Sequence, residues 1–129
     1  MVTLNQIGQI VLFVDNVDIA EKFYENVLGT RKLYRFGNLV FFDCDGIRLL
    51  IESLQVESFV PRSSIIYFRA SDISIAYGDL KSRGVTFIDA PHLIAQMEDH
   101  DLWMVFFKDP AGNTLALMQE APKGWTYPS

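Results

Sequence analysis

The sequence predicts an α+β fold of two tandem modules, each with the order strand, helix, three strands. This order of apolar patterns occurs twice in 129 residues, and shifting one half by 56 positions pairs Ile10 with Ile66 and Ala20 with Ala76. Half of the residues are apolar and 21% are charged, a composition that can bury a continuous core. We therefore expect one folded domain over residues 1–129.

The first module, about residues 7–52, opens with a nearly continuous apolar run that predicts a strand over 7–14. Apolar residues then recur every three or four positions over 17–28, which predicts a helix with one buried face. Asp15 or Asn16 can cap its start and Gly29 can close its end. Two hairpin signals, Gly37-Asn38 and Asp45-Gly46, separate three further predicted strands: 32–36, 39–44 and 47–52.

The second module, about residues 64–120, follows a predicted linker over 53–63 that lacks periodicity and contains Pro61. A strand over 65–69 precedes a helix over 73–83, capped by Ser71 or Asp72 and ended by Gly84. Three strands are predicted after it, over 85–88, 102–108 and 114–119, with a long loop between the first two and a C-terminal tail over 121–129.

Two stretches of sequence identify a family. The duplicated pattern, the text Phe-Lys-Asp-Pro-Ala-Gly-Asn before the last strand and the opening Val-Leu-Phe-Val-Asp-Asn-Val resemble the vicinal oxygen chelate superfamily, over about residues 7–120. That superfamily holds glyoxalases, bleomycin-resistance proteins and extradiol dioxygenases. The resemblance implies that the two sheets curve around a shared cleft with the helices on the convex side, and that the chain forms a homodimer. Exposed strand edges to be covered agree with the dimer.

Alternation along the strands predicts which side chains face that cleft. If Ile10, Leu12 and Val14 pack beneath the helix, their neighbours point the other way. The predicted ligand-binding residues are Gln9, Val11, Phe13, Phe41, Arg48, Leu50, Glu52, Ile65, Tyr67, Arg69, Met104, Phe106, Ala116 and Met118, with Thr114 beside them. Apolar walls with a few polar groups are typical of small-molecule sites. The alternative is that these apolar side chains fill the cleft as core.

The resemblance also implies where a metal would bind. In metal-using members, four symmetry-related positions hold His or Gln, Glu, His and Glu; here they are Gln9, Leu50, Ile65 and Ala116. Aliphatic side chains have no lone pair, and one amide oxygen cannot hold a divalent transition metal against water. We therefore expect no metal and no cofactor. A displaced metal site using Gln9 and Glu52 is the alternative, since Glu52 shares the strand parity of Leu50.

His100 is a second candidate for chemistry. It stands in the run Glu98-Asp99-His100-Asp101, where Glu98 could act with it as an acid/base pair. An exposed acidic loop is the interpretation that we favour for this run. The sequence contains no Ser/His/Asp grouping, glycine-rich phosphate loop or spaced Cys/His cluster.

Charge and composition exclude several partners. Sixteen acidic and eleven basic residues give a net charge of −5, and the basic residues are scattered, so we expect neither nucleic acid nor a membrane as partner. The apolar runs are far shorter than the roughly 20 residues of a membrane helix. No secretory signal pattern opens the sequence and Cys44 is the single cysteine, so we expect a cytoplasmic location.

Three functions follow as hypotheses. The first is a metal-independent binding protein of the glyoxalase/bleomycin-resistance type that sequesters an apolar or aromatic small molecule. The second is a glyoxalase-like lyase or isomerase with a displaced metal site or an acid/base pair. The third is a non-catalytic protein-interaction module. The aliphatic residues at the metal positions favour the first hypothesis over the second and do not bear on the third.

Overall fold

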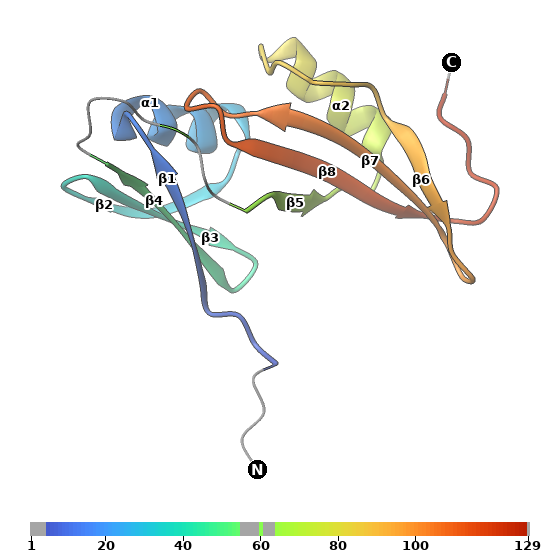
Figure 1. The fold of residues 1–129 in the computed structure, drawn as a ribbon, viewed down its shortest axis with the longest axis horizontal. Coiled ribbons are helices and arrows are strands. Elements are labelled where there is room, and N and C mark those ends of the chain that lie inside the picture. Colours follow the sequence, from blue (N-terminus) through green and yellow to red (C-terminus); the bar gives the residue numbers. More distant parts are fainter. Residues whose placement is uncertain (1–4, 55–59, 61–63, 129) are drawn as a thin grey trace. The chain divides into compact units, whose positions relative to one another are not determined.

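The computed structural model describes residues 5–54, 60 and 64–128, and the chain divides into two compact units (Figure 1). The first unit contains the chain up to Ser64 together with Pro110–Asn113, and the second contains Ile65–Asp109 and the chain from Thr114 on. Each unit has the order strand, helix, three strands, with one four-stranded sheet. The α+β fold of two βαβββ modules is confirmed. The shared cleft and the extent of the single domain stay predictions.

The first unit forms a mixed sheet in the order β1-β4-β3-β2, in which β1 runs parallel to β4 and the other neighbours are antiparallel. Its elements are β1 (Gln9–Val14), α1 (Val17–Lys22), the π-helical turn η1 (Phe23–Val27), β2 (Arg31–Phe36), β3 (Leu39–Cys44) and β4 (Ile47–Ser53).

The helix of this unit is capped by Asn16, whose side-chain oxygen accepts a hydrogen bond from Ile19 N (3.1 Å). The predicted helix over 17–28 is α-helical only to Lys22 and continues as a wider π-helical turn, because Leu28 N donates to Phe23 O (2.9 Å). Tyr24 in this turn is fully buried, with its ring centroid 5.9 Å from that of Phe42. The turn thus anchors the helix on the sheet.

The second unit forms a sheet in the order β5-β8-β7-β6, with β5 parallel to β8. Its elements are β5 (Ile66–Arg69), α2 (Ile73–Ser82), β6 (His92–Gln96), β7 (Asp101–Lys108) and β8 (Thr114–Ala121), and α2 contacts β7 and β8 (Figure 1). Asp72 caps α2 by accepting hydrogen bonds from the N–H groups of Ser74 and Ile75. Gly84 follows the helix at φ 91°, the left-handed conformation that ends it.

One predicted strand of this unit is wrong. Residues 85–88 form a single bridge, between Phe87 and Phe107, and the edge strand is instead β6, in the segment predicted to be a loop. Pairing of this segment with β7 is interrupted for a local reason. Asp89 Oδ1 accepts the hydrogen bond of Phe106 N (2.9 Å), taking the place of a main-chain carbonyl, and Pro91 has no N–H to donate.

The predicted linker over 53–63 lies largely outside the described residues, of which it includes Ser53, Leu54 and Val60. In the described part of the chain, no helix is both long enough and apolar enough to cross a bilayer.

Candidate functional site

One face of the first sheet gathers the residues predicted to line the cleft in this unit. Strand register places Val11 beside Leu50, and Leu50 beside Phe41. The opposite face, with Leu12, Ile51 and Val40 fully buried, packs under the helix. The side chains of this sheet therefore alternate between the two faces as predicted. The predicted ligand-binding residues of this unit all lie on one face: Gln9, Val11, Phe13, Phe41, Arg48, Leu50 and Glu52.

An aromatic and cationic cluster lies on that face. The rings of Tyr34 and Phe41 stack with centroids 4.7 Å apart, and the Arg48 guanidinium lies 5.7 Å from the Phe41 centroid. Tyr34 was not among the predicted residues. It joins the face because the register of β2 shifts between Lys32 and Tyr34, and such a bulge leaves no mark in the local sequence pattern.

Glu52 is the acidic member of the predicted set on this face. It lies beside Phe13 on one neighbouring strand and Leu39 on the other, and is partly buried. Among the described residues, no hydrogen bond or ion pair reaches its carboxylate. A partly buried carboxylate between apolar neighbours is available to a cationic or hydrogen-bond-donating group of a ligand.

The register excludes the displaced metal site. Gln9 lies opposite Arg48, whereas Glu52 lies opposite Phe13, four residues further along β1. At about 3.3 Å per residue, this offset separates the two residues by roughly 13 Å along the strands. A metal ion with ligand distances of about 2 Å cannot contact both side chains. The register therefore argues against the alternative of a displaced metal site shared by Gln9 and Glu52.

The second sheet brings together the other predicted residues. Tyr67 lies beside Ala116, and Ala116 beside Phe106; the rings of Tyr67 and Phe106 meet edge to face, with centroids 6.1 Å apart. The next row along the strands is Arg69, Met118 and Met104. Thr114 begins β8 on the same face, whereas Ile65 precedes β5 and is exposed.

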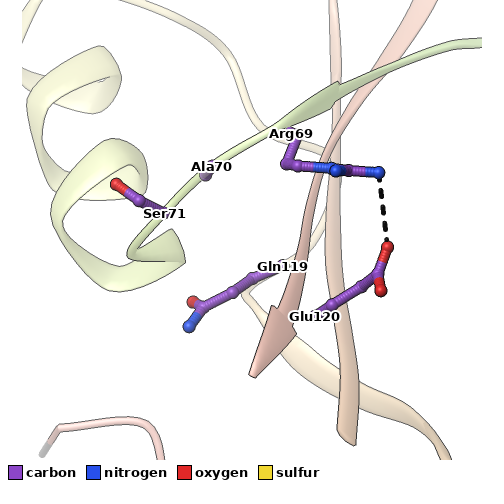
Figure 2. A pocket seen from close by; sticks show the side chains of 5 residues that line it. All are labelled: Arg69, Ala70, Ser71, Gln119 and Glu120. Carbon is purple, nitrogen blue, oxygen red and sulfur yellow. Dashed lines mark hydrogen bonds and ion pairs between the residues drawn. The ribbon is translucent and has the colours of Figure 1, made fainter. Parts of the chain in front are cut away.

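A hollow of about 530 Å³ lies at the carboxyl end of β5, lined by Arg69, Ala70, Ser71, Gln119 and Glu120 (Figure 2). Arg69 Nη2 forms an ion pair with Glu120 Oε1 at 3.4 Å, shown as the dashed line in Figure 2. Of these residues only Arg69 was predicted. Glu120 lies two residues after Met118 on β8, so its side chain points to the same face of the sheet. The predicted strand ends at residue 119 and therefore does not include it.

His100 lies near this hollow and its partners differ from the prediction. Its Nδ1 lies 2.7 Å from Asp99 Oδ1, and its Nε2 lies 3.7 Å from Glu120 Oε2. The hydrogen bond to His100 lowers the pKa of the Asp99 carboxyl. Among the described residues no hydrogen bond or ion pair joins Glu98 to His100, so the carboxylates that His100 meets are Asp99 and Glu120 and not the Glu98 of the alternative acid/base pair.

The C-terminal tail is fastened to the second sheet by Asp101. This buried carboxylate accepts hydrogen bonds from Gly124 N (3.0 Å) and Lys123 Nζ (2.9 Å). Both interactions lower the pKa of Asp101, that of the Gly124 N–H most. Trp125 then packs edge to face on Trp103, with centroids 5.2 Å apart. The predicted C-terminal tail therefore lies, from Lys123 to Trp125, against the β6–β7 hairpin.

This fastening predicts an acid-sensitive tail. Because folding lowers the pKa of Asp101 from its ordinary value near 3.9, the stabilisation is complete above about pH 4 and is lost as pH falls through the lowered value. We expect Asp101→Asn to lower the melting temperature at neutral pH and the difference from wild type to shrink below about pH 4. Asp45→Asn, in an exposed turn, is the control. A difference that stays constant with pH would contradict the prediction.

The residues present do not fit the metal that the fold family implies. Leu50 and Ala116, at two of the four positions, are buried aliphatic side chains, and Ile65 is a third aliphatic residue. Carbon atoms cannot act as ligands, so Gln9 is the one donor of the set. No group of three or more His, Cys, Asp or Glu side chains placed to hold an ion occurs within the described ranges. No chemical step through a metal follows from this site.

Comparison with known proteins agrees with the fold. The model of the Glyoxalase/Bleomycin resistance protein/Dioxygenase superfamily matches residues 6–117. A curated relative, metallothiol transferase FosB from Lysinibacillus sphaericus, is 26% identical over 119 residues, covering 86% of this chain and 79% of the relative. Lactoylglutathione lyase from Agrobacterium tumefaciens has a similar structure, with a TM-score of 0.74 and 22% identity over 96% of this chain and 100% of that one.

A second solved structure, a member of the same superfamily from Sphaerobacter thermophilus, has a TM-score of 0.73 and 24% identity, covering 92% of this chain and 100% of that one. Identities this low show that the fold is shared and say nothing of the ligand.

Proposed function

This chain belongs to the Glyoxalase/Bleomycin resistance protein/Dioxygenase superfamily, and from that premise we propose that it is a metal-independent protein that binds an apolar or aromatic small molecule. The observation that carries the proposal is the replacement of metal ligands by aliphatic side chains at Leu50, Ile65 and Ala116. Where metal-using relatives place donors for a Lewis acid, this chain places aliphatic side chains, and apolar walls are typical of sites for small molecules.

The composition of the two sheet faces supports this proposal. Each offers aromatic and aliphatic side chains with a few charges: Arg48 and Glu52 on one sheet and Arg69 on the other. These charges can fix the polar end of a ligand whose apolar body lies on the strands. The relative FosB is named a metallothiol transferase. That activity is not carried over to this chain, because the donors are missing.

A thermal-shift screen against aromatic metabolites and bleomycin-like compounds tests the proposal. We expect at least one aromatic compound to raise the melting temperature in a concentration-dependent way, since a ligand that binds only the folded state stabilises it by mass action. Leu50→Glu, which adds a carboxylate to the apolar face, should abolish the shift. If no compound stabilises the wild-type protein, the faces are core and the proposal fails.

Metal content provides a second test. We expect protein dialysed against excess zinc, nickel, manganese or iron(II), and then against buffer, to retain far less than one equivalent of ion. Elemental analysis measures this directly. One tightly held equivalent that disappears in Gln9→Ala would show that a metal site exists and would overturn the metal-independent function.

Assembly is part of the proposal. Each sheet has an exposed edge strand. Every residue of β2 is exposed, and so is every residue of β6 except the half-buried Ala95. Covering such edges favours association, and we propose a homodimer. Light scattering should give twice the chain mass at micromolar concentration. A monomer mass throughout that range would contradict the dimer.

A further inference from the structure

The last residues of β8 extend beyond the strand beside them. β5 ends at Arg69, opposite Met118, whereas β8 continues to Ala121. The carbonyl of Met118 still accepts a hydrogen bond from Ala70 N (2.8 Å). Main-chain groups alternate in direction along a strand, so those of Glu120 point to the same side as those of Met118, toward the hollow of Figure 2. The hollow is therefore a place where the sheet has polar groups and no neighbouring strand.

Gln119 lines this hollow and is only 5% exposed. Its Oε1 accepts a hydrogen bond from Ile73 N (2.7 Å), which fixes the orientation of the amide. The amide nitrogen is left with two N–H donors, and no acceptor for them lies among the described residues. This nitrogen is not one of the buried side-chain atoms that lack a partner in the described part of the chain, so it is open to the hollow, where an acceptor group of a ligand can replace water.

Two opposite charges line the other side of the hollow. Arg69 and Glu120 are 75% and 42% exposed at their side chains and make one contact at 3.4 Å. An exposed pair of this kind contributes little stability, so either partner can exchange it for a group on a ligand. A simple anion would be attracted by Arg69 but repelled by Glu120. A simple cation would be attracted by Glu120 but repelled by Arg69. A ligand carrying both charges close together satisfies both residues.

The arrangement in Figure 2 sets the shape of such a ligand. The amide of Gln119 lies on the side of Ser71, away from the Arg69–Glu120 pair, and Ala70 contributes only a small side chain. The volume of about 530 Å³ falls in the range of ligand pockets, about 300–1,000 Å³.

We propose that this hollow binds a small zwitterion of the polar α-amino-acid type. The ligand ammonium donates to the Glu120 carboxylate, the ligand carboxylate accepts from the Arg69 guanidinium, and an acceptor at the far end of the ligand receives the free N–H of Gln119. This site shares Arg69 with the apolar ligand proposed above, but an aromatic compound on the sheet faces needs neither Gln119 nor Glu120.

Titration with L-glutamine, whose side-chain carbonyl supplies the acceptor, tests the proposal. Trp103 lies beside Gln119 on the neighbouring strand, and its indole N–H is buried without a partner among the residues described. We therefore expect a saturable change of tryptophan fluorescence, confirmed by calorimetry, with a dissociation constant in about the millimolar range. No saturation up to about 10 mM would overturn the proposal.

Matched variants separate the site from general effects. Arg69→Ala and Glu120→Gln should each weaken L-glutamine binding about tenfold or more, the equivalent of about 1.4 kcal/mol. The exposed pair of Asp79 and Arg83 on α2 (2.9 Å) provides the controls, since Asp79→Asn and Arg83→Ala remove the same charges outside the hollow. Equal binding by the Arg69 and Arg83 variants would contradict the proposal.

The role of Gln119 has its own test. Gln119→Glu keeps an oxygen for Ile73 N but replaces the N–H donors by a second acceptor, so we expect a normal melting temperature and loss of binding. Norvaline, which has the carbon chain of glutamine without the amide, should bind about tenfold more weakly to the wild type. Equal affinity for glutamine and norvaline, or full binding by Gln119→Glu, would show that Gln119 does not contact the ligand.

Discussion

Replacing Phe107 by alanine is expected to lower the free energy of unfolding by about 3–5 kcal/mol. Phe107 is fully buried in the second sheet, and its ring centroid lies 5.4 Å from that of Phe87. Phe87 in turn lies 4.5 Å from Tyr77 on α2, so Phe107 begins a chain of rings that joins the sheet to its helix. Truncation removes apolar contacts and leaves a cavity that the sheet cannot collapse to fill.

Urea unfolding measures this change as a lower midpoint with an unchanged slope. Phe36→Ala is the matched control, because Phe36 is 73% exposed on the edge strand β2 and should change the midpoint little. Similar losses in the two variants would mean that Phe107 is not part of the core.

Replacing Glu52 by glutamine is expected to weaken a cationic ligand of the sheet face about thirtyfold, a loss on the order of 2 kcal/mol. Glu52 is partly buried between Phe13 and Leu39, where a charge-assisted hydrogen bond is screened less than at the surface. Glutamine keeps the size of the side chain and removes only the charge. The measurement is a titration with whichever compound the thermal-shift screen identifies.

The sign of the Glu52 effect identifies the charge of the ligand. Weaker binding indicates a cation, and tighter binding indicates an anion that the carboxylate had repelled. Glu25→Gln removes a carboxylate from the helical side of the same unit, where it pairs with Lys32, and should leave binding unchanged. A Glu52 variant that loses stability but alters no binding would place Glu52 in the core.

Local rules in the sequence determined most of the fold. The apolar periods of 2 and 3.6 residues, the caps at Asn16 and Asp72 and the glycines after each helix depend on neighbours within a few positions, so the sequence carries them directly. The face of each strand on which the predicted strand residues lie followed from the same patterns. The family followed from a resemblance of the duplicated pattern and two stretches of text, and the family model confirms it.

Tertiary contacts decided what the patterns could not. The edge strand β6 formed where a loop was predicted, because the apolar run over 93–95 is too short to predict a strand and pairing with β7 stabilises it. The bulge that brings Tyr34 beside Phe41, and the register that separates Gln9 from Glu52, depend on how one strand pairs with another. The hollow of Arg69, Gln119 and Glu120 exists because β5 stops before β8, and the relative length of two strands whose paired residues, such as Ile66 and Leu115, lie far apart in sequence is set by their pairing.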